Sequence, residues 1–467
     1  MIDVDGLLKK FVPDEEKHNR PLLKAVSKIL KKLLHQEEIN QFINNNRHLD
    51  GLEFNDAVLE HFDFSFRVSN RDRKNIPAEG RVLIVANHPL GSLDGLALLK
   101  LVSEIRPDVK IVATTLLNQI DPLKNLFLSV DNFSHKASQL KHMRNIIRAL
   151  KADQAVILFP TGEVSRFKPN GIRDGRWKTG FLSLAEKTGA PVLPVYIEGK
   201  NSAAFYAISS LYKPLGTVML VNEMFNKQDK EISFHIGKPI QWQTLAKLEM
   251  PKKKIAKRMR KQVYRLARGN KAKKHELFET INNVIHPVKT KLIRKELRAS
   301  QLIGATQDGK EIYLFDYQHN SSVMKEIGRL RELSFRQVME GTGNPLDIDA
   351  YDRYYRHLIL WDDEELEIVG AYRIAETGKI IHEKGLEGLY THSLFRFEDE
   401  LLPYLEDSIE LGRSFVQPRY WGKRSLDYLW YGIGAYLNQN PDIKYMLGPV
   451  SLSASYPEEA KRWIASF

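Results

Sequence analysis

Residues 81–97 read RVLIVANHPLGSLDGLA, and this pattern decides the fold. Val82–Ala86 is a short apolar run rich in β-branched residues, which is typical of a buried strand. After a glycine-containing turn, an apolar segment of helical period follows over Leu96–Val102. The turn carries His88 and Asp94, and strand-to-helix turns are where open α/β sheets commonly hold their chemistry.

A histidine beside a carboxylate is the usual way to build a general base. Taken alone, a turn histidine next to a helix-capping aspartate is more often structural, because short motifs match by chance. The residues downstream therefore decide between these two interpretations of His88.

The composition is that of a globular chain with a large excess of positive charge. Its 467 residues are enough for two or three domains, and 43% hydrophobic with 27% charged residues is ordinary. We expect no transmembrane helix, because no apolar run approaches about twenty residues. We expect no signal peptide, because the N-terminus has acidic residues early and lacks the apolar core of such a peptide. Cysteine is absent, which excludes disulfides and thiolate metal sites and fits a cytoplasmic protein.

Positive charge is concentrated in Lys252–Lys274. This segment contains twelve Lys or Arg and no Asp or Glu, a surplus equal to the net charge of +12 of the whole chain. Ile255, Met259, Val263 and Leu266 predict an apolar stripe on a basic helix, which is typical of a membrane-surface element. Nucleic-acid binding and a solvated linker helix are the alternatives, but no nucleic-acid-binding signature accompanies the segment. We expect anionic membrane lipids as partners and no nucleic acid.

Strand and helix patterns alternate from about residue 80 to 240, which predicts an α/β domain with a mainly parallel sheet. The expected strands are Val82–Ala86, Val109–Thr114, Ala155–Phe159, Val192–Ile197 and Ile232–Ile236. A basic, leucine-rich stretch at residues 20–46 predicts a helical lead-in, a candidate second membrane-facing surface.

The pattern restarts near residue 302 and predicts an α+β domain. Its expected elements are strands Glu311–Tyr317, Leu358–Trp361, Glu367–Ile374, Ile409–Val416 and Tyr445–Leu452, and helices Ser322–Gly341 and Ser425–Leu437. The predicted organisation is a helical lead-in at 1–69, an α/β domain at 70–245, a basic helical connector at 246–300 and an α+β domain at 301–467.

A second polar loop follows an apolar strand in the first domain. Residues 159–166, FPTGEVSR, place Glu163, Ser165 and Arg166 close together. We expect this loop and the turn with His88 to line one cleft, with the PVLPV strand at 191–195 as another wall. A histidine base with a guanidinium that holds an anionic group suits acyl transfer to a hydroxyl. No G-x-S-x-G motif supports a serine hydrolase, and no cluster of suitable spacing predicts a metal site.

The order of these motifs resembles that of the glycerolipid acyltransferase superfamily, which includes lysophosphatidic acid acyltransferases. The motifs are Asn87-His88 to Asp94, then FPTGEVSR, then PVLPV. The resemblance covers residues 70–240. It implies that His88 is the general base that activates an acceptor hydroxyl, that Asp94 orients it, and that the donor is an acyl thioester. We expect the FPTGEVSR loop to bind substrate.

Two departures from the family pattern concern the acceptor. Five residues rather than four separate His88 from Asp94, and Thr161 stands where the family commonly has glutamate. Glycine in the turn can absorb the additional residue. Both departures argue against glycerol phosphate as the acceptor, and the chain looks like a divergent branch that carries the label hemolysin.

The second domain carries its own ordered motifs, which are RELSFR at 331–336, Asp349, Tyr351, Asp352, His357-Leu358 with Asp362, VGAYR at 369–373, ELGRS at 410–414 and GPVS at 448–451. They resemble the acyl-carrier-protein-dependent N-acyltransferases of the GNAT fold that make lyso-ornithine and related amino-acid lipids. Related enzymes continue beyond the point where this chain ends, so we expect a domain shortened at its C-terminus.

The loop QPRYWGKR at 417–424 precedes an expected helix, where backbone N–H groups and nearby cations form an anion site suited to a phosphopantetheine phosphate. We assign Arg419, Lys423 and Arg424 to this site. Glu410 is a candidate for deprotonating an attacking amine, and Arg413 for holding a carboxylate or the carrier phosphate. The alternative for these last two residues is a cross-strand ion pair on a solvated face.

A chain with both modules resembles the bifunctional acyltransferases that make ornithine lipids or related amino-acid lipids. The expected substrates are an amino acid, a lyso-lipid and acyl-acyl carrier protein, or acyl-CoA, as donor, with no cofactor. We expect a cytoplasmic protein that is peripheral on the inner face of the cytoplasmic membrane. One alternative is a lysophospholipid acyltransferase with an inactive or regulatory GNAT-like domain, and another is a membrane-binding scaffold without activity.

Overall fold

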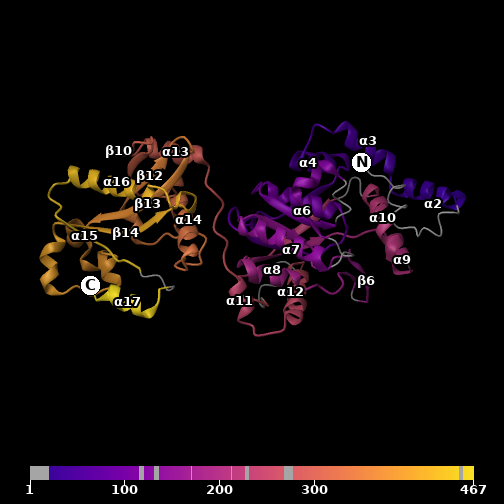
Figure 1. The fold of residues 1–467 in the computed structure, drawn as a ribbon. Coiled ribbons are helices and arrows are strands. Elements are labelled where there is room, and N and C mark those ends of the chain that lie inside the picture. Colours follow the sequence, from indigo (N-terminus) through magenta and orange to yellow (C-terminus); the bar gives the residue numbers. More distant parts are fainter. Residues whose placement is uncertain are drawn as a thin grey trace. The chain divides into compact units, whose positions relative to one another are not determined.

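The computed structural model describes residues 20–114, 120–130, 136–169, 171–211, 213–226, 231–267, 277–451 and 456–466. The chain divides into two compact units, residues 1–283 and residues 284–467, each considered by itself (Figure 1). Among the described residues, no helix is both long and apolar enough to cross a bilayer. Residues 1–19 of the predicted lead-in lie outside the described part.

Unit 1 is built on a seven-stranded sheet with the order β1-β9-β8-β2-β5-β3-β4. Its strands are β1 (Ser65–Val68), β2 (Val82–Ala86), β3 (Val109–Thr114), β4 (Phe127–Val130), β5 (Ala155–Leu158), β8 (Val192–Glu198) and β9 (Glu231–Ile236). Every pairing is parallel except β8 with β9, so the predicted fold class is confirmed. The sequence missed β1 and β4, which are four residues long and lack a sustained apolar run.

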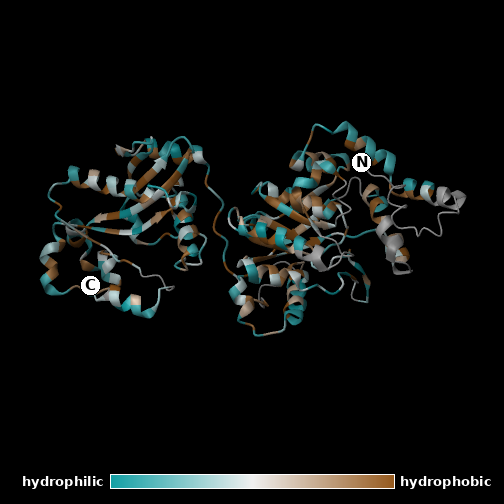
Figure 2. Cartoon of the chain, in the orientation of Figure 1, coloured by the Kyte–Doolittle hydropathy of each residue, from teal (hydrophilic) through white to brown (hydrophobic). Residues whose placement is uncertain are grey.

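Helices cover both faces of this sheet, which is why its central strand is apolar throughout. In β2, Val82, Ile84 and Ala86 belong to one buried cluster, and Leu83 and Val85 belong to the other. Figure 2 shows brown, apolar strands inside unit 1, between teal and white helices. The helices of unit 1 are α2 (Arg20–Leu33), α3 (Gln36–Asn45), α4 (Gly51–His61), α5 (Asn70–Arg73), α6 (Leu93–Ser103), α7 (Lys136–Lys151), α8 (Gly180–Thr188), α9 (Ala203–Leu211), α10 (Lys213–Phe225), α11 (Trp242–Ala246) and α12 (Lys252–Leu266).

The apolar stripe of the basic helix α12 is part of the protein core. Ile255, Met259 and Val263 are at most 4% exposed and pack in the second buried cluster, and Leu266 is half-buried near Gly237. The prediction that this stripe faces a membrane is therefore wrong, because the same periodicity serves a helix packed on a sheet. The residues of the basic segment after Ala267 lie outside the described part.

Unit 2 is built on a six-stranded sheet with the order β10-β11-β12-β13-β14-β15. Its strands are β10 (Gln301–Ala305), β11 (Glu311–Asp316), β12 (Arg356–Asp362), β13 (Glu367–Glu376), β14 (Ser408–Val416) and β15 (Tyr445–Leu447). All neighbours pair antiparallel except β14 with β15, which confirms the second part of the predicted fold class. The last strand is shorter than expected and ends before Pro449, which has no N–H to donate.

One face of this sheet packs on α13 (Thr290–Arg298) and α14 (Ser322–Gln337), and the other packs on α16 (Ser425–Gln439). Two further helices are α15 (Thr377–Lys384) and α17 (Glu458–Ala465). Strand β14 contains a bulge, because Ala371 pairs with Phe415 whereas Arg373 pairs with Gly412. The extra residue at this point positions Arg413 in the candidate site of unit 2.

Candidate active sites

The first candidate site lies at the carboxyl end of β2, where the chain turns into α6. His88 Nδ1 lies 3.1 Å from Oδ2 of Asp94, which is fully buried in the first turn of α6. The Asp94 carboxylate also accepts backbone N–H groups of Leu90, Gly91 and Gly95 at 2.9 to 3.2 Å. The turn therefore fixes the carboxylate, and the carboxylate fixes the imidazole.

Glycine accommodates the additional residue of this turn, as the sequence indicated. Gly91 has φ +109°, a conformation that residues with a Cβ rarely adopt. A Cβ at Gly91 would lie 3.0 Å from Leu220 of α10, which packs over the turn. Both the conformation and the close packing thus require glycine.

The two charges of the pair stabilise each other. Burial alone would lower the pKa of His88, but the charge of Asp94 and its hydrogen bond outweigh burial, so the pKa is raised from 6.5. Burial would likewise raise the pKa of Asp94, and the charge of His88 with the hydrogen bonds at the turn lowers it. An ionised Asp94 accepts a hydrogen bond from Nδ1–H of His88. This leaves Nε2 of His88 unprotonated, so that it can take a proton from a substrate.

A second buried carboxylate, Asp174, connects this turn to the FPTGEVSR loop. Its side chain accepts the His88 N–H at 3.2 Å, the Ser165 hydroxyl at 2.5 Å and the Trp177 indole N–H at 2.8 Å. Its own N–H donates to Tyr264 of α12 at 2.7 Å. Burial raises the pKa of Asp174. Sequence reasoning gave Asp174 no role, because its partners come from four separate segments.

The FPTGEVSR loop brings two of its three predicted residues to the His88 turn. Ser165 is buried, and its N–H donates to the His88 carbonyl at 2.7 Å. Arg166 follows at the start of β6 (Arg166–Lys168), with its guanidinium 5.2 Å from the Phe205 ring centre. Its Nε and Nη1 atoms are buried without a hydrogen-bond partner among the described residues, as expected of a cation that receives an anionic ligand. Glu163 is exposed.

In unit 2, Glu410 lies on β14 and is buried. Its carboxylate accepts hydrogen bonds from the Tyr355 and Thr391 hydroxyls and from the backbone N–H groups of Tyr390 and Thr391. Four donors occupy both oxygens, so this environment holds the Tyr390–Thr391 segment in place and leaves no lone pair directed at an open site. The alternative of a solvated ion pair between Glu410 and Arg413 is wrong.

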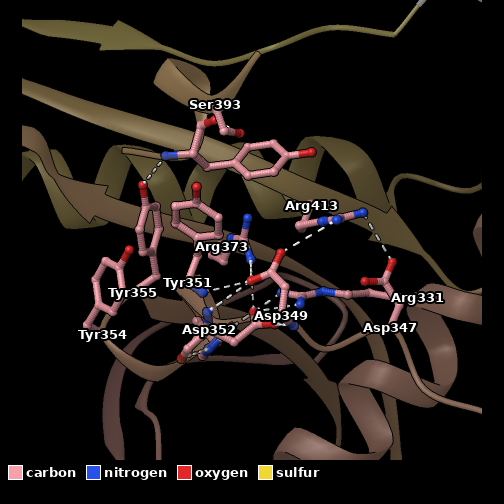
Figure 3. Close-up of polar contacts among 12 residues, drawn as sticks. Arg331, Asp347, Asp349, Tyr351, Asp352, Tyr354, Tyr355, Arg373, Ser393 and Arg413 are labelled. Carbon is pink, nitrogen blue, oxygen red and sulfur yellow. Dashed lines mark hydrogen bonds and ion pairs between the residues drawn. The ribbon is translucent and has the colours of Figure 1, made fainter. Parts of the chain in front are cut away.

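Arg413 instead belongs to a cluster of arginines and aspartates in which Arg331, Asp352 and Arg373 are buried and Arg413 and Asp349 are half-buried (Figure 3). It lies at the β14 bulge with φ +48°, and its guanidinium is 3.3 Å from Asp347 and 3.5 Å from Asp349. Arg373 of β13 contacts Asp349 at 2.6 Å and Asp352 at 3.3 Å. Several nitrogen atoms in the cluster, Arg331 Nε, Arg373 Nε and Nη2, and Arg413 Nε, are buried without a hydrogen-bond partner among the described residues.

Tyrosine rings surround the centre of this cluster. The guanidinium of Arg373 lies 4.9 to 5.6 Å from the ring centres of Tyr351, Tyr355 and Tyr390. Burial would raise the pKa of Asp352, but the charges of the neighbouring arginines lower it to about 2. The cluster therefore keeps fixed charges beside aromatic faces, an arrangement able to bind a small zwitterion.

The three cations that the sequence assigned to an anion site in unit 2 have different environments in the structure. Arg419 pairs with Glu367 at 2.7 Å and with Glu365 at 2.5 Å, so its charge is already matched. Lys423 and Arg424 are exposed directly before α16 begins at Ser425. Among the described residues, no group of three or more His, Asp or Glu could hold a metal ion.

Comparison with known proteins finds matches for both units. The family model described as acyltransferase matches residues 14–273, and the acetyltransferase (GNAT) domain model matches residues 330–431. The lyso-glycine lipid O-acyltransferase of Bacteroides thetaiotaomicron is 33% identical over 258 residues, which are 54% of this chain and 92% of that protein. A solved acyltransferase structure from Thermotoga maritima, PlsC, aligns with 18% identity and a TM-score of 0.30 over 52% of this chain and 97% of that chain, which is too low to support an inference.

Two N-acyltransferases match the second half of the chain. The glycine N(alpha)-acyltransferase of B. thetaiotaomicron is 38% identical over 200 residues, which are 40% of this chain and 59% of that protein. The L-ornithine N(alpha)-acyltransferase of Brucella abortus is 29% identical over 148 residues, which are 28% of this chain and 50% of that protein. This chain therefore spans half to three fifths of the length of these two relatives.

Proposed function

Because this chain belongs to the acyltransferase family and carries a second, GNAT acyltransferase domain, we propose that it makes an amino-acid lipid by two successive acyl transfers. Unit 2 transfers a 3-hydroxyacyl group to the amine of an amino acid. Unit 1 then acylates the 3-hydroxyl of that product. The relatives that match the two halves carry out reactions of these two kinds, to judge by their names.

The observation that carries the proposal is the His88–Asp94 pair at the end of β2. In unit 1, Nε2 of His88 takes the proton of the acceptor hydroxyl while the oxygen attacks the thioester carbonyl carbon. A C–O bond forms, the C–S bond breaks, and His88 returns the proton to the leaving thiolate. Asp94 holds the imidazole in the required tautomer, and the buried guanidinium of Arg166 binds an anionic group of donor or acceptor.

In unit 2, the ammonium group of the amino acid first releases one proton to solvent, which leaves a free amine. The amine nitrogen attacks the thioester carbonyl carbon, a C–N bond forms, the C–S bond breaks, and the leaving thiolate takes up the second proton that the nitrogen loses. The Arg–Asp cluster with its tyrosine rings binds the amino acid. Nitrogen atoms of Arg373 and Arg413 without a hydrogen-bond partner among the described residues receive its carboxylate, and the partly exposed Asp349 receives its ammonium group. The higher identity to a glycine N-acyltransferase favours glycine over ornithine as this amino acid.

The acyl donor that we propose is acyl-acyl carrier protein, with acyl-CoA as the alternative. Lys423 and Arg424 at the start of α16 support it, because exposed cations at a helix N-terminus suit the phosphopantetheine phosphate. Both products are lipids, so we place the protein at the inner face of the cytoplasmic membrane.

The test uses the purified full-length protein with a synthetic N-(3-hydroxyacyl)glycine and an acyl thioester. Wild type forms the O-acylated lipid, His88→Ala does not, and His235→Ala, the same substitution on β9, retains the activity. If wild type leaves this acceptor unchanged but acylates lysophosphatidic acid, the protein is a lysophospholipid acyltransferase. If neither acceptor reacts, the proposal is rejected.

A further inference from the structure

The outward face of α12 is an uninterrupted basic surface. Its lysines Lys253, Lys254, Lys257 and Lys261 are exposed, whereas the opposite face of the helix is buried in the core of unit 1. The helix contains no acidic residue over its whole length. This surface therefore attracts an anionic partner, and it is the reverse of the face that the sequence pattern had assigned to a membrane.

The hairpin of β6 and β7 (Gly171–Arg173) carries an exposed aromatic side chain. Phe167 at the centre of β6 is 67% exposed and lies between two cationic residues, Arg166 and Lys168. No acidic residue occurs between Val164 and Arg173. An exposed phenylalanine on a hairpin without acidic residues suits the boundary between lipid headgroups and acyl chains.

The hairpin and α12 lie side by side. Arg260 of α12 donates to the Gly175 carbonyl at 2.5 Å, and the Arg173 guanidinium lies 5.0 Å from the Tyr264 ring centre. Lys257 lies three residues before Arg260, and Lys261 lies three residues before Tyr264. Side chains with this spacing are neighbours on the surface of a helix. The exposed lysines and the exposed phenylalanine thus belong to one region of unit 1.

This region is connected directly to the first candidate site. The residue before β6, Ser165, donates its N–H to the His88 carbonyl, and Tyr264 of α12 accepts the N–H of Asp174. A surface bound at the hairpin therefore lies next to the turn that carries the general base.

We propose that the exposed lysines of α12 and Phe167 form one docking surface for an anionic lipid bilayer, which places the His88 site at the membrane. The lysines contact lipid phosphates, and Phe167 enters the headgroup region. An acidic protein such as a carrier protein would also be attracted to the lysines, but it gives no reason for an exposed phenylalanine in the same region. The inference rests on the proposed function in one respect, which is that the acceptor of unit 1 is a lipid.

Binding of the full-length protein to phosphatidylglycerol vesicles tests the surface. The variant Lys253→Glu/Lys257→Glu/Lys261→Glu should bind about a hundredfold more weakly than wild type, because each surface lysine contributes substantially at an anionic membrane. The control Lys289→Glu/Lys291→Glu/Lys295→Glu changes three exposed lysines at the start of unit 2 by the same charge, and it should lose much less. Equal losses in the two variants would overturn the proposal.

Insertion of the hairpin has its own readout. Phe167→Ser should weaken vesicle binding, and Phe167→Trp should add a component to the emission spectrum that shifts to the blue on vesicles and is quenched by brominated lipid. An unshifted, unquenched component would overturn the proposal, and so would an α12 variant that still binds vesicles but no longer binds acyl carrier protein. Acyl transfer to a detergent-dispersed acceptor should persist in the α12 variant, so loss of docking is distinguishable from failure of the proposed function.

Discussion

His88 contacts two buried carboxylates that act on different parts of the residue. Asp94 holds the ring through Nδ1, and Asp174 holds the backbone N–H. Because the pKa of His88 is raised above 6.5 in the folded protein, its protonated form contributes stability below that pH. That contribution is lost as the pH rises through the raised pKa, and the neutral imidazole needed for catalysis appears over the same interval.

The first prediction concerns pH. O-acyl transfer should fall as the pH drops through the raised pKa of His88, because a protonated imidazole accepts no proton. Asp94→Asn should move this fall in rate, the acidic limb of the pH–rate profile, to lower pH, because it removes the charge that raises the pKa of His88. It should also lower kcat by roughly a hundredfold or more, because Asp94 no longer fixes the tautomer of the imidazole. The pH–rate profiles of both proteins check this, and an unshifted limb would contradict it.

The second prediction concerns Asp174 as a positioning residue. Asp174→Asn places an amide N–H against at least one of the three donors that the carboxylate accepts, so we expect kcat to fall about tenfold with KM for the thioester little changed. The acidic limb should move less than in Asp94→Asn, because Asp174 contributes least to the pKa of His88. A shift equal to that of Asp94→Asn would show that Asp174 acts on the imidazole itself.

The third prediction separates two roles of Glu410. Glu410→Gln turns an acceptor of four hydrogen bonds into a group with its own N–H donors, so unit 2 should lose about 1–3 kcal/mol of stability along with N-acylation. Urea unfolding of the full chain, monitored with a spectroscopic probe in unit 2, measures this loss of stability. Unchanged stability with lost N-acylation would restore Glu410 to the role of general base.

The ordered motifs of the sequence were enough to predict the contact between His88 and Asp94, because both residues lie in one short turn. The FPTGEVSR loop follows β5, which pairs in parallel with β2, so its Ser165 and Arg166 come to the same edge of the sheet as that turn. Asp174 and the environment of Glu410 could not be predicted, since each depends on partners from distant segments that only the folded chain brings together.

At the scale of elements, hydrophobic patterning predicted the positions of strands and helices well. It was less successful in predicting whether the apolar face of an element packs on the protein core or on a membrane. Strands β2 and β3 have the predicted bounds. Both faces of β2 are buried, as expected of a central parallel strand, whereas β3 alternates buried and half-buried residues before its exposed end. The periodicity of α12 correctly indicated one apolar face, but a period of 3.6 residues is the same whether a protein core or a membrane covers that face.

The fourth prediction concerns the turn between β2 and α6. Gly91→Ala introduces a Cβ at a positive φ and close to Leu220, so it should cost about 1–3 kcal/mol and lower the rate of O-acylation. Gly171→Ala is a matched control, because Gly171 has φ +95° with open space around its Cβ position. Both should lower stability, and only Gly91→Ala should lower kcat. Equal kcat values would mean that the turn does not position His88.

At the scale of the whole molecule, the two units each bury their own core on both faces of their own sheet. Among the described residues, each of these buried clusters draws its members from one unit, so we expect substitutions that inactivate one site to leave the other active. This independence is what makes the order of the two acyl transfers testable, because the product of the first reaction accumulates when the second is blocked.

The most direct test of the two-site account is the lipid extract of a bacterial host that makes no amino-acid lipid and expresses the full chain. Wild type should yield an O-acylated amino-acid lipid, and His88→Ala should yield only the N-acylated lyso form, identified by mass spectrometry. His235→Ala should match wild type. An extract in which wild type produces no amino-acid lipid, or in which His88→Ala still produces the O-acylated form, would contradict the account.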